Sequence, residues 1–134
     1  MQKAGMGMSR VLGKRVLLVE DERWVRECIK RLLWLDGHSV TEAANGVEAC
    51  ELFEQGEYDV VITDHDMPKM AGSALVATIR NRAPGQPIIM ITARAEVLEL
   101  EENPPNAVLS KPFGVAELRE TMATLLTPPP PQPD

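Results

Sequence analysis

Acidic, hydroxyl and amine side chains stand at the ends of short apolar runs along this chain. Glu20 and Asp21 end the first of these runs, and Asp64 ends the third. Thr92 ends the fourth run, and Lys111 follows the last one. Ligands of open parallel sheets bind beyond the carboxyl ends of the strands. If the runs are strands of such a sheet, we expect these five side chains to converge at one edge.

The chemistry of this residue set points to a divalent cation and a phosphoryl group. Clustered carboxylates are costly unless a cation neutralises them, and ligands that are all oxygen favour a hard ion such as Mg²⁺. A carboxylate can attack a phosphoryl group when Mg²⁺ compensates the repulsion between the two anions. Asp64 is the predicted nucleophile, with Thr92 and Lys111 as hydrogen-bond donors to phosphoryl oxygens.

The apolar pattern predicts the elements that would position these residues. Short β-branched runs alternate with longer stretches at helical spacing, which is typical of a parallel sheet covered by helices. The third run is continuously apolar, which indicates a central strand covered on both faces. The predicted strands are 15–20, 38–43, 58–64, 88–92 and 107–110, and the predicted helices are 23–35, 46–55, 73–82 and 114–126.

The length of 134 residues predicts one domain. We expect a flexible N-terminal segment over residues 1–13, a globular domain over 14–127 and a proline-rich tail or linker over 128–134. Apolar residues make up 44% of the chain and charged residues 25%, values near those of soluble proteins. The chain shows no secretory signal and no apolar run long enough to span a bilayer, so a cytoplasmic location is expected.

Charge and cysteine content exclude further classes of function. A net charge of −6 disfavours direct binding to nucleic acid, because DNA-binding proteins concentrate basic residues on one face. Cys28 and Cys50 are too far apart in sequence for a CxxC redox or zinc pair. We expect both cysteines to be small buried hydrophobic residues.

Four sequence stretches together resemble the receiver domains of two-component response regulators, including the chemotaxis receivers. The stretches are 17–22 (LLVEDE), 62–72 (ITDHDMPKMAG), 91–93 (ITA) and 111–113 (KPF), and the resemblance extends over about residues 15–126. It implies an α/β, flavodoxin-like (βα)5 sandwich of three layers. The five-stranded parallel sheet would have the strand order 2-1-3-4-5.

The resemblance also implies roles for individual residues. Asp64 would accept a phosphoryl group from a histidine kinase or a histidine phosphotransfer protein. Asp21 and Asp64 would hold Mg²⁺, with Glu20 contributing through water and Asp66 through its main-chain carbonyl. The domain would then catalyse only its own phosphorylation and dephosphorylation, and would not be an enzyme for other substrates.

Further implications of the resemblance concern sensing and partners. Thr92 and Lys111 would sense the phosphoryl group, and the Lys111–Pro112 peptide bond would be cis, since cis bonds are almost confined to proline. An output domain or separate effector protein is a further expected partner. The expected oligomeric state is a monomer or a phosphorylation-dependent dimer.

Two features depart from the common receiver pattern, and a further pair of residues suggests an additional contact. Val108 stands three positions before Lys111, where family members usually carry an aromatic residue. The acidic stretch 95–103 precedes two prolines, so the helix expected there is curtailed. Asp66 and Arg94 lie two positions beyond Asp64 and Thr92, and our hypothesis is that they form an ion pair that shields the phosphoryl group.

Two other functions remain open at this stage. The run ending in Asp64-His65-Asp66 also resembles the first motif of haloacid-dehalogenase-type phosphatases, although the acidic pair then stands on the wrong side of the lysine. A receiver fold that binds partners without cycling phosphate is the second alternative. Val108 and the curtailed helix favour it, whereas the intact acids, Thr92 and Lys111 oppose it.

Single residues have plainer interpretations as well. Asp21 alone would be typical of a helix cap. We expect His65 to be an exposed loop residue rather than a metal ligand. Trp24 and Trp34 are expected to have a core or packing role, with a docking patch for the phosphodonor as the alternative role of Trp24.

Overall fold

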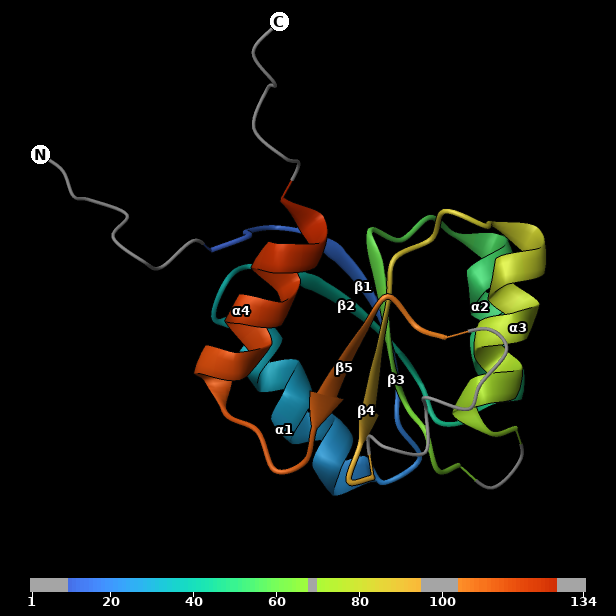
Figure 1. The fold of residues 1–134 in the computed structure, drawn as a ribbon, viewed down its shortest axis with the longest axis horizontal. Coiled ribbons are helices and arrows are strands. Elements are labelled where there is room, and N and C mark those ends of the chain that lie inside the picture. The colour runs from blue at the N-terminus through green and yellow to red at the C-terminus, as the bar shows by residue number, and fades with distance from the viewer. Residues whose placement is uncertain (1–9, 68–69, 95–103, 128–134) are drawn as a thin grey trace, which may run out of the picture.

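A five-stranded parallel sheet forms the centre of the molecule (Figure 1). The computed structural model describes residues 10–67, 70–94 and 104–127. Its strands follow the order β2-β1-β3-β4-β5, which confirms the predicted order. The elements are β1 (Arg15–Val19), α1 (Arg23–Trp34), β2 (Ser39–Ala43), α2 (Gly46–Gln55), β3 (Val60–Asp64), α3 (Gly72–Arg82), β4 (Ile88–Thr92), β5 (Ala107–Ser110) and α4 (Val115–Leu126).

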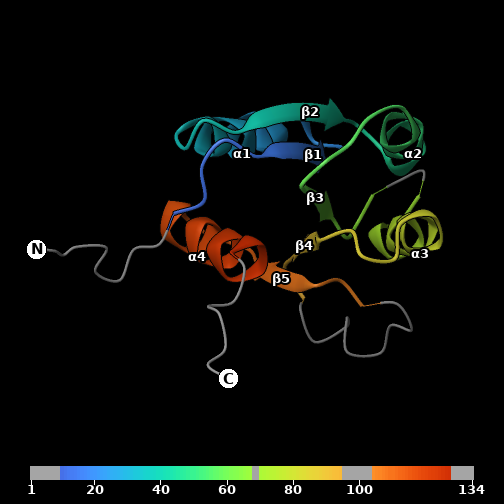
Figure 2. The same cartoon turned by 90° about the horizontal axis from the view of Figure 1, so that it is seen from above.

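The helices cover both faces of the sheet and create a three-layer sandwich. Figure 2 shows α1 and α4 on one face and α2 and α3 on the other. Each face has its own core, because successive strand residues point to opposite sides. On β1, Leu17 faces the cluster that includes Leu75 of α3, whereas Leu18 faces the cluster that includes Ile29 and Leu33 of α1.

The strand and helix boundaries agree with the predicted ones to within two residues. All five residues of β3 are buried, as a central strand requires. His38, predicted to start the second strand, instead precedes β2 and accepts a hydrogen bond at Nδ1 from the main-chain nitrogen of Lys14 at 2.9 Å. The curtailed helix predicted over 95–103 lies outside the described residues, as do residues 1–9 and 128–134.

The expected core role of the two tryptophans is wrong. Trp24 is 79% exposed and Trp34 is 54% exposed. Each lies five residues from Ile29, which places it about 140° around the helix from the buried stripe. Cys28 is exposed on the same helix, against expectation, whereas Cys50 is half-buried. These side chains leave α1 with an exposed face that contains both aromatic rings.

Within the described residues, no helix combines the length and the apolar character that crossing a membrane requires.

Candidate functional site

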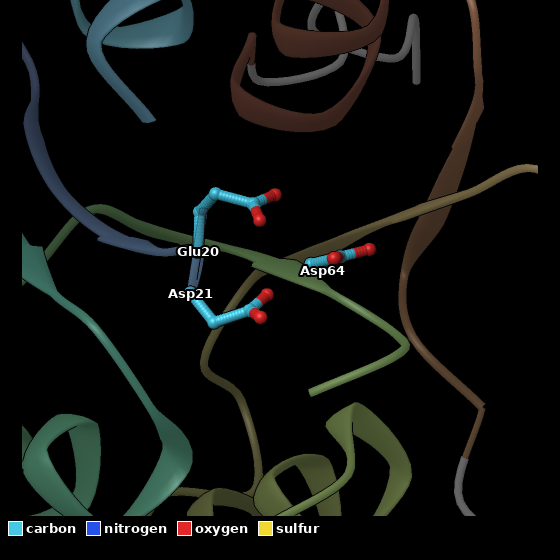
Figure 3. A group of neighbouring side chains, drawn as sticks. All are labelled: Glu20, Asp21 and Asp64. Atoms are coloured by element: carbon cyan, nitrogen blue, oxygen red, sulfur yellow. The ribbon is translucent and has the colours of Figure 1, made fainter. Parts of the chain in front are cut away.

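Three carboxylates meet at the carboxyl ends of the two central strands. β1 pairs with β3 in a register that places Val19 opposite Thr63. The residues that follow these two positions, Glu20 and Asp64, are therefore brought side by side. One carboxylate oxygen from each of Glu20, Asp21 and Asp64 lies within 4.8 Å of the others (Figure 3). The acidic group expected at this edge of the sheet is thus confirmed.

Burial makes this acidic group electrostatically costly without a cation. Glu20 is 1% exposed and Asp64 is 5% exposed. Burial raises the pKa of Glu20 to about 7; a hydrogen bond from the Glu22 main chain lowers it, the charge of Asp64 raises it and the charge of Lys111 lowers it. Two acidic groups this close and this buried favour either a bound proton or a bound cation.

One oxygen of Glu20 lacks a partner in the described part of the chain. Its Oε2 atom accepts a hydrogen bond from the Glu22 main-chain nitrogen at 3.0 Å. Its Oε1 atom is buried and has no hydrogen-bond partner among the described residues. A buried carboxylate oxygen without a donor is unfavourable, so this atom is suited to accept a hydrogen bond from water or to lie near a cation.

The ammonium of Lys111 reaches Asp64 from the residue that directly follows β5. Its Nζ atom lies 3.3 Å from Oδ1 of Asp64, and the Lys111 side chain remains 34% exposed. The main-chain nitrogen of Lys111 donates to the carbonyl of Thr92 at 2.9 Å, which keeps the ends of β4 and β5 together. The Lys111–Pro112 peptide bond is cis, as the resemblance implies.

Thr92 contributes a buried hydroxyl at the end of β4. The residue is 2% exposed. Its Oγ1 atom accepts a hydrogen bond from the Arg94 main-chain nitrogen at 3.0 Å. Since that bond uses an oxygen lone pair, the hydroxyl proton stays available for donation to an anion. The structure therefore brings both predicted hydrogen-bond donors, Thr92 and Lys111, to the same edge of the sheet as the acids.

A close approach of the chain to Asp64 requires Gly72. The Gly72 main-chain nitrogen donates to the carbonyl of His65 at 2.9 Å. A Cβ atom on Gly72 would lie 2.6 Å from the main-chain oxygen of Asp64 and 2.8 Å from the sulfur of Met90. These distances are too short for any side chain, so the start of α3 can contact β3 only through glycine. The predicted helix begins at residue 73, one position after this glycine, and the contact was not predicted from the sequence.

The ion pair expected between Asp66 and Arg94 is absent from the described residues. Asp66 instead contacts Nδ1 of His65 at 3.2 Å, with the Asp66 side chain 68% exposed. Adjacent residues in the chain can pair without closing a loop, so this local contact takes the place of the expected ion pair. The His65 side chain is only 14% exposed, so its expected exposure is wrong as well. His65 does not belong to the carboxylate group described above.

Arg26 is a second residue that sequence reasoning missed. Its Nη1 atom donates to the main-chain oxygen of Glu20 at 2.8 Å. Nothing in the sequence separates Arg26 from Arg23 and Arg31, which lie on the same helix. The only available signal is its position one turn after the acidic pair, and that position by itself specifies no contact.

Comparison with known families places this geometry in context. A family model described as the response regulator receiver domain matches residues 16–123. The response regulator MprA of Mycobacterium sp. (strain KMS) is 37% identical over 115 residues, which cover 84% of this chain and 50% of that protein. The sensor kinase CckA of Brucella abortus is 40% identical over 116 residues, which cover 83% of this chain and 12% of that protein. The chain thus spans half or less of these relatives.

Solved structures agree with the sequence comparison. The response regulator TrrA of Thermotoga maritima, in complex with Mg²⁺ and BeF, has a TM-score of 0.79 and 35% identity, and the match covers 84% of this chain and 99% of that one. The receiver domain of the sensor histidine kinase PA1611 from Pseudomonas aeruginosa, with Mg²⁺ in its active site cleft, has a TM-score of 0.79 and 31% identity. That match covers 85% of this chain and 98% of the other.

Proposed function

The chain belongs to the response regulator receiver domain family, and on that premise we propose that Asp64 is its phosphoacceptor. The observation that carries the proposal is the position of Asp64. Its buried carboxylate ends the central strand, belongs to a group of three acids and contacts the ammonium of Lys111 at 3.3 Å. A nucleophile for phosphoryl transfer needs both kinds of neighbour: carboxylates that bind a metal ion, and a cationic group that binds the incoming phosphoryl anion.

The donor set at this edge fits Mg²⁺. Asp21 and Asp64 supply carboxylate oxygens, and the unpartnered Oε1 atom of Glu20 can accept a hydrogen bond from a metal-bound water. The main-chain carbonyl of Asp66 is the proposed further ligand. When bound, Mg²⁺ compensates the negative charge that separates the carboxylate of Asp64 from an incoming phosphoryl group.

The chain's own residues then carry the transfer. A carboxylate oxygen of Asp64 forms a bond to phosphorus while the bond between phosphorus and a histidine nitrogen of the donor breaks. The other ring nitrogen of the donor histidine carries a proton, so the donor leaves as a neutral imidazole with the electron pair of the broken bond, and Asp64 becomes an acyl phosphate. Lys111 and the hydroxyl of Thr92 donate hydrogen bonds to phosphoryl oxygens, so they stabilise the charge that moves onto the acceptor.

The proposed donor is a histidine kinase or histidine phosphotransfer protein. Trp24 is a proposed contact for this donor, because it is 79% exposed and follows Asp21 by less than one helical turn. The domain is proposed to extend over residues 14–127, with 128–134 as a tail or a linker to an output domain. A cytoplasmic location and a monomer or phosphorylation-dependent dimer belong to the same proposal.

The family match argues against the haloacid-dehalogenase hypothesis, because the matched model extends over nearly the whole described chain. A receiver fold that binds partners without phosphate is the remaining alternative. Val108, in place of an aromatic residue, is the observation that favours it. The side chain of Val108 is 38% exposed on β5, so partners can reach it.

Intact-protein mass spectrometry after incubation with acetyl phosphate and Mg²⁺ tests the proposal. We expect one phosphoryl adduct on the wild type and none on Asp64→Asn or in a magnesium-free control. A rapidly quenched wild type without an adduct, together with failure to bind beryllofluoride, would favour the phosphate-independent module.

A further inference from the structure

Arg26 fixes the main chain at the acidic end of β1. Its Nη1 atom donates to the carbonyl oxygen of Glu20 at 2.8 Å. The main-chain nitrogen of Glu20 donates to the carbonyl of Ala43 on β2 at 3.0 Å. Both main-chain polar groups of Glu20 are therefore held. The carbonyl of Glu20 belongs to the peptide that joins Glu20 to Asp21. The oxygen of this peptide is therefore held by Arg26 of α1, and the chain just before it is held by β2.

The guanidinium of Arg26 is itself held in place by neighbouring side chains. Its Nε atom donates to Oε1 of Glu42 at 3.1 Å, and Arg26 is only 17% exposed. The other oxygen of Glu42 accepts from Nζ of Lys30 at 3.0 Å, and Lys30 also contacts Glu27 at 2.9 Å. A planar guanidinium with two fixed partners has little freedom to rotate. The network therefore joins α1, the end of β2 and the end of β1 through hydrogen bonds to charged groups.

We propose that Arg26 is a positioning residue for the metal site, acting through the carbonyl of Glu20. The inference rests on the proposed function, since it concerns the Mg²⁺ that the three acids would hold. Mg²⁺ demands near-octahedral geometry, so a small shift in the Glu20-Asp21 peptide weakens its binding. Arg26 touches neither the metal nor the phosphoryl group, and it is therefore not a catalytic residue.

The sign of the effect separates positioning from simple electrostatics. Arg26 carries a positive charge close to a site that binds a cation. If only its charge mattered, replacing it with a neutral residue would reduce repulsion and tighten Mg²⁺ binding. If it positions the acidic pair, the same replacement weakens binding, by about tenfold when judged from outer-sphere partners of other metal sites. The two explanations predict opposite directions.

Isothermal titration calorimetry with Mg²⁺ measures this effect on the whole chain. The variants are Arg26→Gln, Arg26→Lys and the matched control Arg23→Gln. Arg23 lies on the same helix and is exposed, and its side chain forms no hydrogen bond or ion pair with any described residue. Circular dichroism at the titration temperature shows whether each variant is folded, so that a loss of stability is not mistaken for a loss of affinity.

We expect the Kd for Mg²⁺ to rise about tenfold in Arg26→Gln and to change less than twofold in Arg23→Gln. Arg26→Lys keeps the charge but loses the forked geometry, so its Kd should lie between those of wild type and Arg26→Gln. An unchanged or lower Kd in Arg26→Gln overturns the inference. If Arg26→Gln fails to fold, Arg26→Lys decides, and a Kd equal to that of wild type overturns the inference.

The proposed function is tested separately by including Asp64→Asn. If wild type binds Mg²⁺, Asp64→Asn binds it much more weakly and Arg26→Gln binds as wild type does, only the inference about Arg26 fails. If wild type binds no Mg²⁺, the proposed function and the inference both fail.

Discussion

Replacing Glu20 with glutamine removes a buried charge and keeps the shape of the side chain. Burial raises the pKa of Glu20 from 4.5 to about 7 in the metal-free protein. Between those values the folded state binds the proton and the unfolded state does not. The group therefore contributes stability at low pH that is lost as the pH rises through about 7. Glutamine does not titrate, so Glu20→Gln should lack this pH dependence.

The size of the effect follows from the shift in pKa. A rise from 4.5 to about 7 corresponds to roughly 3 kcal/mol over the whole titration, of which about 2 kcal/mol is lost between pH 5.5 and 8.5. The free energy of unfolding of Glu20→Gln, minus that of wild type, should thus increase by about 2 kcal/mol over this interval. Taking the difference between the two proteins cancels the contributions of other titrating groups.

Urea unfolding followed by circular dichroism in EDTA supplies both free energies at several pH values. A parallel measurement in saturating Mg²⁺ should remove most of this pH dependence from the wild type, because a bound cation keeps the carboxylate of Glu20 ionised in the folded state. Curves for wild type and Glu20→Gln that stay parallel from pH 5.5 to 8.5 would refute the reasoning, since the buried carboxylate would then titrate normally.

Three further predictions concern single residues. Gly72→Ala places a Cβ atom 2.6 Å from the Asp64 carbonyl, so urea unfolding should show a loss of about 1–3 kcal/mol; unchanged stability would mean that α3 moves freely. Thr92→Ala should slow phosphorylation by acetyl phosphate about tenfold, as expected for one lost charge-assisted hydrogen bond, whereas Thr92→Ser should react at close to the wild-type rate. Equal rates for the two variants would show that the hydroxyl of Thr92 does not contribute to phosphoryl transfer. Burial lowers the pKa of His38 below 6.5, so the contribution of His38 to stability should fall as the pH drops from 7 to 5, and the free energy of unfolding of His38→Asn, minus that of wild type, should rise over that interval in urea unfolding.

The sequence predicted the site because strand ends can be located from the apolar pattern alone. Asp64 and Thr92 end continuously apolar runs, and parallel pairing brings such ends to one edge. Which face of α1 is buried was harder to predict. Trp24 is apolar, yet it lies outside the buried stripe formed by Ile29 and Leu33. Apolar character alone does not say which side of a helix faces the sheet.

The predictions that failed concern side-chain contacts rather than elements. The positions of Asp66 and Arg94 near one site suggested an ion pair between them, but the carboxylate of Asp66 contacts the adjacent His65 instead. The contacts of Arg26 depend on the register between β1 and β2 and on the rotation of α1. Neither quantity can be read from spacing along the chain, so such contacts emerge only from the three-dimensional structure.

Reduction of the phosphorylated protein with borohydride tests the central claim most directly, because it converts an aspartyl phosphate into homoserine at the modified position. After treatment with acetyl phosphate and Mg²⁺, peptide mass spectrometry should find homoserine at position 64. Homoserine at position 21 or 66 instead, or at no position in a protein that carries a phosphoryl adduct, would contradict the assignment of Asp64 as phosphoacceptor.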